Sequence, residues 1–394
     1  MKMIPINSYI LKIASRCNLN CSYCYEYNMG DDSWLDMPAF MEPEIVKLVA
    51  TRIHDHCTTH ELTEIYINLH GGEPLLLGKQ RTRNLLETFV KNLEGIKIYW
   101  GIQTNGVLLD PEWIDLLHTY GFFLGLSIDG PAATNDRFRV DHAGKGTHLR
   151  VMTGAGHLAS EKGELIFAGC LSVIDPESDP LEVFRHLLTL NAKAIDFLLP
   201  HGNWDDVPNS KRPDPMSVTP FADWLIPIFD EWYDQYSERL EIRMFEEIIE
   251  HLAGGPGRLE TVGLQPVSLI VVASNGDIEG VDTLKSIPGQ QLLGLNLKQH
   301  SFDDAVKHPK YQLRQNGLEA LSGTCQSCSL VKTCGGGYLP HRWSKDNQFQ
   351  NPSIFCSDLT TLILHIRRRV TSTIDATSVT LSKGGSQESI NPTE

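Results

Sequence analysis

Residues 8–24, SYILKIASRCNLNCSYC, are the stretch on which the prediction of the fold depends. Residues 8–14 form a short apolar run that is typical of a buried strand. Cys17, Cys21 and Cys24 follow this run closely and within eight residues of one another. The stretch therefore predicts a strand that ends in a loop with three neighbouring thiols.

Further along the chain, short apolar or β-branched runs alternate with stretches of helical periodicity. The predicted strands are residues 8–14, 64–69, 97–103, 122–128, 164–173 and 194–199. The predicted helices are residues 43–56, 79–93, 111–119, 147–160 and 180–190, and three of them open with proline. Strands joined by crossover helices lie parallel, so the pattern predicts an α/β fold, either a doubly wound sheet or a partial barrel.

In both folds the loops that follow the strands form the functional rim. Four loops of unusual composition lie there: CNLNCSYC at 17–24, HGGEP at 70–74, QTNG at 103–106 and SIDG at 127–130. We therefore expect the functional residues on this rim.

Composition and charge narrow the function. The 394 residues are 41% apolar and 21% charged, which is ordinary globular usage. A net charge of -15 disfavours nucleic acid as a partner. No run of 18 apolar residues and no signal peptide is recognisable, so we expect a soluble cytoplasmic protein without a membrane partner.

The cysteines suggest metal or redox chemistry. There are nine, an odd number, and seven of them are clustered, whereas Cys57 and Cys170 are isolated and read as core residues. The three thiolates at 17–24 can bind three irons of a [4Fe-4S] cube and leave the fourth iron open to a small molecule. A zinc site would need a fourth ligand, and His54, His56 and Cys57 lie on a distant predicted helix.

Cys17, Cys21 and Cys24, with the aromatic Tyr23 before the third cysteine, resemble the signature of the radical S-adenosylmethionine (SAM) family. The resemblance implies a partial (β/α)6 barrel of the TIM type with a lateral opening that admits an extended peptide. It also implies SAM and a [4Fe-4S] cluster, whose reductive cleavage of SAM releases a 5′-deoxyadenosyl radical that abstracts hydrogen.

Other rim residues match the family as SAM contacts. Gly71, Gly72 and Glu73 resemble its GGE motif, in which backbone and carboxylate receive the SAM ammonium group. Asn105 and Ser127 end strands where the family places polar contacts. Arg150 matches an arginine that pairs with the SAM carboxylate. A plain turn at 71–74 and a surface arginine on a helix remain as alternatives.

A second cysteine group lies near the C-terminus. Cys325, Cys328, Cys334 and Cys356 offer four soft ligands, which suit either zinc or a fully ligated cluster. The group resembles the SPASM extension of radical SAM enzymes, which implies an auxiliary [4Fe-4S] cluster. SPASM proteins usually have a second auxiliary cluster, but Val281 and Tyr338 stand where its cysteines belong, so we expect two clusters in total.

Asp282 follows Val281 at a position where some SPASM enzymes place a base that removes a proton from the substrate. The alternative is a solvated carboxylate on the hairpin predicted around Asn275-Gly276. We predict four segments: a radical SAM barrel at 1–200, a helical connector at 201–257, a SPASM-like domain at 258–371, and a disordered tail at 372–394.

The run CGGGYLPHR at 334–342 resembles maturases of ribosomally made precursor peptides that form cyclophanes. The predicted function is therefore carbon–carbon crosslinking of an aromatic side chain to a nearby β-carbon in a precursor peptide, with flavodoxin or ferredoxin as electron donor. The alternatives are a SPASM enzyme that forms thioethers or oxidises Ser or Cys, as in sulfatase maturation, and a zinc-stapled binding protein without catalysis.

Overall fold

The computed structural model describes residues 4–384, with side chains described for residues 4–373. Six strands follow one another in a parallel sheet, each beside the next along the chain. They are β1 (Ser8–Ala14), β2 (Glu64–Gly71), β3 (Lys97–Thr104), β4 (Phe123–Ser127), β5 (Phe167–Val173) and β6 (Ala194–Leu198). Each of the six predicted strands is therefore present.

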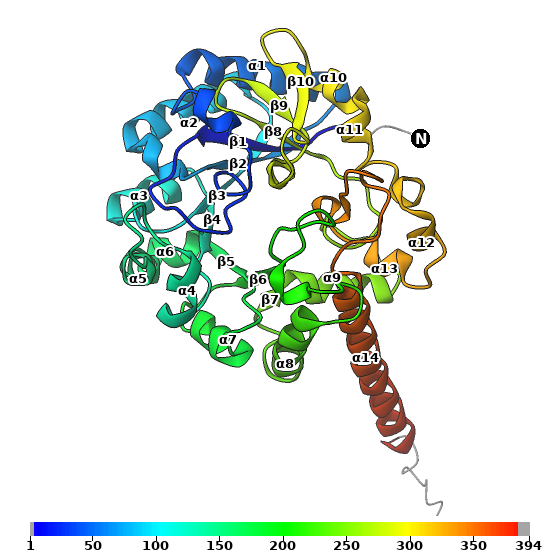
Figure 1. Cartoon of the computed structure of the whole chain (residues 1–394). Helices are drawn as coiled ribbons and strands as arrows, with labels where there is room; N and C mark the ends of the chain where they lie inside the picture. The colour runs from blue at the N-terminus through cyan, green and yellow to red at the C-terminus, as the bar shows by residue number, and fades with distance from the viewer. Residues whose placement is uncertain (1–3, 385–394) are drawn as a thin grey trace, which may run out of the picture.

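Helices cross over between these strands and lie on the outside of the curved sheet (Figure 1). The predicted helices correspond to α1 (Pro43–His60), α2 (Lys79–Asn92), α3 (Pro111–Thr119), α5 (His148–Gly156) and α7 (Pro180–Leu188). Because all of them lie on the same side of the sheet, the architecture is a partial barrel rather than a doubly wound sheet, as the resemblance implied.

Two short helices are not predicted by the periodicity, α4 (Ala132–Phe138) and α6 (Glu161–Ile166). The second occupies the first part of the run at 164–173 that was expected to be strand. Ser160 caps it by accepting a hydrogen bond from the Gly163 amide (3.2 Å), so β5 begins only at Phe167.

The segment expected to be a helical connector also extends the sheet. It contains α8 (Pro220–Gln235), β7 (Glu241–Ile242) and α9 (Arg243–Leu252), and β7 pairs in parallel with β6. The connector is thus not helical throughout, because two residues between the two helices pair with the sheet edge.

The predicted hairpin around Asn275-Gly276 is present, and Gly276 adopts the left-handed φ of +90° that its turn requires. Its strands are β8 (Leu269–Val272) and β9 (Asp277–Glu279), and β10 (Leu292–Asn296) pairs with β9. Because β8 also pairs in parallel with β1, the C-terminal part of the chain continues the barrel sheet.

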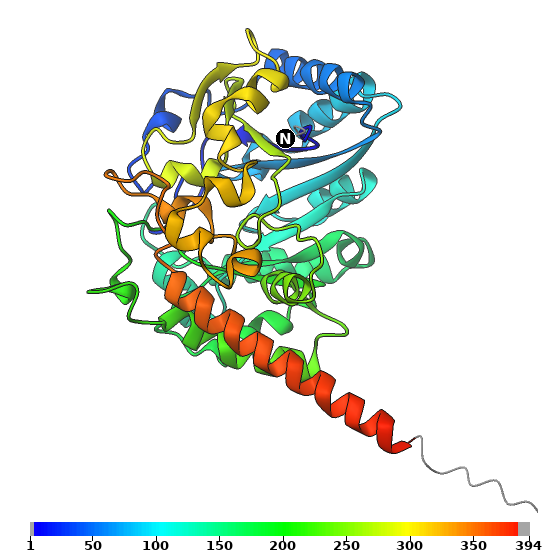
Figure 2. The ribbon, with the colours of Figure 1, turned by 90° about the vertical axis from the view of Figure 1, so that its right-hand side faces the viewer.

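The rest of the chain lies on the concave side of the sheet (Figures 1 and 2). It comprises α10 (Phe302–Lys307), α11 (Pro309–Gln312), α12 (Gly323–Gln326), α13 (Val331–Cys334) and α14 (Cys356–Gly384). Short 3-10 helices lie at Ser33–Asp36, Pro74–Leu77, His157–Ala159, Asn209–Lys211, Asp282–Ser286, Gly317–Ala320 and Leu339–Arg342. Within residues 4–384, no helix combines the length and the apolar character needed to cross a bilayer.

The last helix, α14, runs from Cys356 to Gly384. Leu359, Leu362, Ile363 and Ile366 recur at helical spacing and are buried, and α14 packs on α8 and α9. The helix then projects beyond the body of the molecule (Figure 2) and ends at Gly384, inside the segment expected to be a disordered tail. Residues 385–394 of that segment lie outside the described residues.

Candidate active site

A cavity of about 430 Å³ lies at the carboxyl ends of the barrel strands. It is bounded by the loops after β1, β2, β3 and β4 and, opposite them, by the C-terminal part of the chain. Most of the residues singled out in the sequence line it: Cys17, Cys21, Tyr23, Cys24, Gly71, Gly72, Asn105, Ser127 and Asp282. Segments far apart in the sequence therefore share one site.

The three-cysteine loop forms one wall. Asn105 Nδ2, from the loop after β3, lies 3.8 Å from Cys17 Sγ, and the Leu19 amide donates to the same sulfur at 3.4 Å. Burial raises the pKa of Cys24 to about 12, with a contribution from the nearby Glu26. These thiols therefore need neighbouring positive charge to ionise, which an iron cluster supplies.

The spacing of the sulfurs distinguishes between metal groups. A single tetrahedral zinc ion holds its sulfurs about 3.8 Å apart, given a Zn–S bond of about 2.3 Å. In the described part of the chain, no three cysteine Sγ atoms lie within 4.8 Å of one another. The three thiols thus do not form a compact single-ion site, and three thiolates on one loop can bind three irons of an iron–sulfur cube.

Tyr23 and Arg139 lie together beside this loop. The Tyr23 hydroxyl donates to Asp129, and Arg139 donates to the Tyr23 hydroxyl at 2.8 Å. Arg139 is 7% exposed, lines the cavity, and its Nε has no hydrogen-bond partner among the described residues. Its guanidinium is thus available to an anionic group in the cavity.

Arg150, in contrast, is not brought to the site. It lies on α5 with 44% of its side chain exposed and pairs with Asp141 at 2.9 Å. The structure therefore matches the surface alternative for this residue, whereas Arg139 and Arg243 line the cavity.

The GGE segment shapes the wall next to the cysteines. Gly71 and Gly72 line the cavity, and a Cβ on Gly72 would overlap the Tyr27 hydroxyl and the backbone of Arg16. Glu73 is buried behind the wall, where its carboxylate accepts from Thr104 Oγ1 (2.7 Å) and the amides of Asn105 (2.8 Å) and Leu75 (3.0 Å). It ties the loop after β2 to the loop after β3.

Ser127 also lies on the wall. It accepts a hydrogen bond from Gln103 Nε2 at 2.8 Å, and both residues line the cavity. The polar ends of β3 and β4 thus face the same space as the cysteine loop, as the rim argument predicts.

Asp282 lines the cavity and is only 4% exposed, so it is not a solvated hairpin carboxylate. Lys12 Nζ is 2.7 Å from its Oδ2, the Tyr25 hydroxyl donates to it at 2.7 Å, and His70 Nδ1 is 4.0 Å away. Burial alone would raise the pKa of Asp282, but Lys12 and His70 outweigh it and hold the pKa well below its usual range. Asp282 is therefore an ionised, oriented carboxylate.

A chain of buried ion pairs extends from Asp282. Lys12 also contacts Glu26, Lys285 binds Glu26 at 3.0 Å, and Lys285 lies 3.5 Å from Glu279. All five side chains are at most 8% exposed. Glu279 is the last residue in this series of ion pairs, and burial raises its pKa to about 7. Alternating charges thus hold Asp282 in place.

The sequence analysis did not single out Tyr25, His70, Lys12 or Arg139. Tyr25 directly follows Cys24 and His70 directly precedes Gly71, so their adjacency to the motifs was a usable signal. Lys12 is a charged residue inside an otherwise apolar strand, and this was a second usable signal. Arg139 follows α4, a helix that the periodicity did not predict.

The four C-terminal cysteines also gather. Cys325 lies in α12, Cys334 ends α13, Cys356 begins α14, and Cys328 lies in the turn between α12 and α13. Burial, together with the nearby thiols of Cys356, Cys325 and Cys328, raises the pKa of Cys334 to about 12. The four sulfurs are therefore electrostatic neighbours.

The surroundings of this group suit an anionic cluster. The first residue of α14 is Cys356, where the helix dipole is positive. Arg342 is 5% exposed, and its Nε and one terminal nitrogen have no hydrogen-bond partner in the described residues. Burial lowers its pKa to about 10, against the effect of Cys325 and Cys334 beside it. Its free N–H groups are available to sulfur.

The two positions where a second auxiliary cluster would need cysteines are filled differently. Val281 is buried, and the Tyr338 hydroxyl is 2.5 Å from Thr283 Oγ1. Nearby, Arg314 pairs with Glu260. Cys57 and Cys170, the cysteines outside the two groups, are buried in the core as expected.

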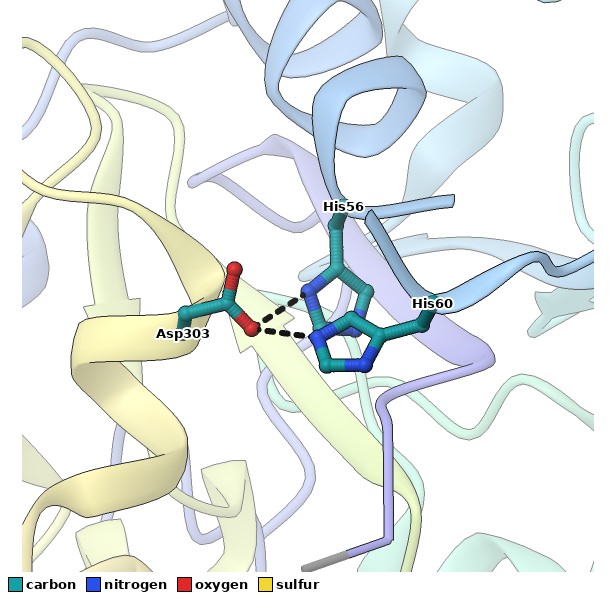
Figure 3. A group of neighbouring side chains, drawn as sticks. All are labelled: His56, His60 and Asp303. Atoms are coloured by element: carbon teal, nitrogen blue, oxygen red, sulfur yellow. Dashed lines mark hydrogen bonds and ion pairs between the residues drawn. The ribbon is translucent and has the colours of Figure 1, made fainter. Parts of the chain in front are cut away.

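Two histidines outside the cavity, His56 and His60, lie close to Asp303 (Figure 3). Asp303 Oδ1 lies 3.1 Å from His56 Nδ1 and 2.7 Å from His60 Nε2. The Ile6 amide donates to His56 Nε2 at 3.0 Å, so the neutral ring has its proton on Nδ1 and has no lone pair there for a metal. The group joins α1 to α10 and is not a metal site.

Comparisons with known proteins agree with this geometry. Residues 11–168 match the family model of the Radical SAM superfamily. A cysteine-type anaerobic sulfatase-maturating enzyme of Clostridium perfringens is 25% identical over 359 residues, 90% of this chain and 94% of the relative. A serine-type enzyme of Bacteroides thetaiotaomicron is 24% identical over 363 residues, 86% and 84% of the two chains.

The fold is also that of a solved relative. The structure of native anSMEcpe with bound AdoMet and Cp18Cys peptide has a TM-score of 0.80 and 22% identity, and the match covers 95% of this chain and 99% of the other. Residues 11–168 therefore match a radical SAM domain, and the chain is an enzyme related to anaerobic sulfatase-maturating enzymes with the expected α/β fold. The zinc-stapled protein without catalysis is thereby set aside.

Proposed function

We propose that this enzyme oxidises a Ser or Cys side chain in a peptide or protein substrate. The observation that supports this most is that the three-cysteine loop and the ionised Asp282 line one cavity. The relatedness to cysteine-type and serine-type sulfatase-maturating enzymes favours oxidation over crosslinking as the first candidate.

In this proposal Cys17, Cys21 and Cys24 hold a [4Fe-4S] cluster, and Gly71, Gly72, Asn105 and Ser127 contact SAM. When bound, these groups supply the 5′-deoxyadenosyl radical that takes a hydrogen atom from the substrate β-carbon. Arg139, on the cavity wall, makes the contact with the SAM carboxylate that was expected of Arg150. Glu73 orients the loops after β2 and β3 from behind the wall.

Asp282 then accepts a proton from the hydroxyl or thiol of the target side chain. Loss of one electron from the carbon radical makes this proton strongly acidic, so a carboxylate with a low pKa suffices to take it. Cys325, Cys328, Cys334 and Cys356 hold the auxiliary cluster that accepts the electron, and flavodoxin or ferredoxin supplies electrons to the enzyme. The substrate loses a hydrogen atom, an electron and a proton in total.

Cyclophane crosslinking of a precursor peptide is the second candidate, and one observation favours it. Tyr338, which stands where a ligand of a second auxiliary cluster belongs, lines the cavity and adds ring surface to it. Crosslinking replaces one C–H bond on the β-carbon and one on the ring with a C–C bond. The same hydrogen atom, electron and proton acceptors serve both reactions.

The two candidates differ in their product. We expect the reconstituted enzyme, given SAM and reductant, to convert a peptide of the Cp18Cys type to a thioaldehyde. Water hydrolyses the thioaldehyde to an aldehyde with release of hydrogen sulfide, and a hydrazine probe labels the aldehyde. A crosslinked peptide would lose two hydrogens but would contain no aldehyde. Labelling absent with Ser and Cys peptides, together with a two-hydrogen loss in an aromatic peptide, would replace the first candidate with the second.

A further inference from the structure

Four aromatic side chains meet on one part of the cavity wall. Tyr25 comes from that loop, His201 follows β6, and Tyr338 and His341 belong to the C-terminal part of the chain. The ring centroids are 5.1 Å apart for Tyr25 and His201 and 5.5 Å for Tyr338 and His341, with nearly perpendicular planes. His201 and His341 lie 6.0 Å apart and connect the two pairs. We call these four residues the aromatic box.

The aromatic box has unpartnered polar atoms. His201 Nδ1 and His341 Nε2 are buried and have no hydrogen-bond partner among the described residues, and His341 is only 3% exposed. Buried nitrogens without a partner are costly, so a ligand that supplies one gains affinity. Burial lowers the pKa of His201 to about 4, and both rings are neutral and can donate or accept according to tautomer.

We propose that the aromatic box receives an aromatic side chain that has a ring N–H or O–H, of the tyrosine or tryptophan class, from the peptide substrate. This inference rests on the proposed function in its crosslinking form. Edge-to-face ring contacts suit an aromatic guest, and the free imidazole nitrogens suit its polar atom.

Other guests fit less well. A cationic side chain would meet Lys12, whose Nζ already lies 5.4 Å from the Tyr25 ring, and the nearby carboxylates Asp282 and Glu260 are already paired with Lys12 and Arg314. An aliphatic side chain would leave both imidazole nitrogens unpaired. A Ser or Cys side chain is too small to contact rings on both sides.

The position of the aromatic box also suits the chemistry. The Tyr25 hydroxyl donates to Asp282 at 2.7 Å, and the Tyr338 hydroxyl bonds to Thr283, the next residue. A ring held there lies beside the carboxylate that is proposed to accept a proton. The aromatic box would therefore determine which substrate side chain is joined to the β-carbon.

Equilibrium dialysis tests this inference on the full chain, reconstituted anaerobically and supplied with SAM. The probes are the N-acetyl amides of tyrosine, tryptophan, phenylalanine, leucine and lysine. We expect the tyrosine and tryptophan amides to bind about five-fold tighter than the phenylalanine amide, as one buried hydrogen bond allows. The leucine and lysine amides should bind more weakly still.

His201→Phe and His341→Phe keep a ring and remove the nitrogens. In these variants the preference for tyrosine over phenylalanine should fall about five-fold, while retained binding of the phenylalanine amide shows that the cavity is intact. His186→Phe is the control, because His186 pairs with His148 and does not line the cavity.

Tyrosine-amide affinity that is unchanged in both variants, or leucine or lysine amides that bind as tightly as the aromatic ones, would overturn the inference. Cleavage of SAM by the unsubstituted enzyme is measured separately. If that cleavage fails, the proposed function fails, whereas the dialysis result still decides whether the aromatic box selects aromatic side chains.

Discussion

At the scale of single residues, the chemistry depends on how charges are held. Asp282 is buried beside Lys12, and Lys12 is held in turn by Glu26. A buried carboxylate without such a partner would take up a proton and lose its function as a base. Because Lys12 keeps the pKa of Asp282 below its usual range, Asp282 stays ionised at neutral pH and loses its charge only well into acid.

Asp282→Asn should therefore separate hydrogen abstraction from product formation. Asparagine keeps the shape but cannot accept a proton, so product formation should fall by about 10²-fold or more, while 5′-deoxyadenosine is still released. Quantifying both products by chromatography checks this. Asp346→Asn is the control, since Asp346 is exposed. Equal losses of the two products would show that Asp282 acts on SAM binding instead.

Individual residues were predictable where a motif at a strand end contained them. The cysteines, Gly71, Gly72 and Ser127 belong to such motifs, and the structure brings them together. Arg150 is different, because helical periodicity does not show which way a polar residue on the first turn points. It pairs with Asp141, whereas Arg139 reaches the cavity through a Tyr23 contact across 116 residues of sequence.

At the scale of elements, the loops at the strand ends determine the site. Five of the six strands begin within one residue of the predicted position, because apolar runs bounded by polar residues are local signals. Pairing is not local: β7 joins the sheet with only two residues, and β8 pairs with β1 across about 260 residues of sequence. The reading of 201–257 as a helical connector fails in part for this reason, whereas the fifth strand begins late because Ser160 caps α6 in front of it.

Gly72→Ala tests the close packing of the loop after β2. The added methyl group would overlap the Tyr27 hydroxyl and the Arg16 backbone, so we expect a loss of about 1–3 kcal/mol in the free energy of unfolding. Gly156→Ala on α5 has open space and should change stability by about 1 kcal/mol at most, in the stabilising direction. Denaturant unfolding of both measures the difference, and equal stabilities would show that the loop relaxes freely.

At the scale of the whole molecule, one sheet joins the barrel to the part of the chain with the second cysteine group. The sheet runs from β10 through β1 to β7. The N-terminal and C-terminal parts of the chain therefore line one cavity together. The proposed segments at 1–200 and 258–371 are thus parts of one structure with two cysteine groups. In the proposed function, this arrangement would place a radical source, a proton acceptor and an electron acceptor around one substrate.

The most direct test is reductive cleavage of SAM. Reconstituted under argon, the enzyme should be brown, contain about eight irons per chain, and release 5′-deoxyadenosine from SAM when dithionite is added. The variant with Cys17, Cys21 and Cys24 replaced by Ala should keep about four irons and release none. A colourless protein, or undiminished 5′-deoxyadenosine release by that variant, would contradict the assignment of the three-cysteine loop.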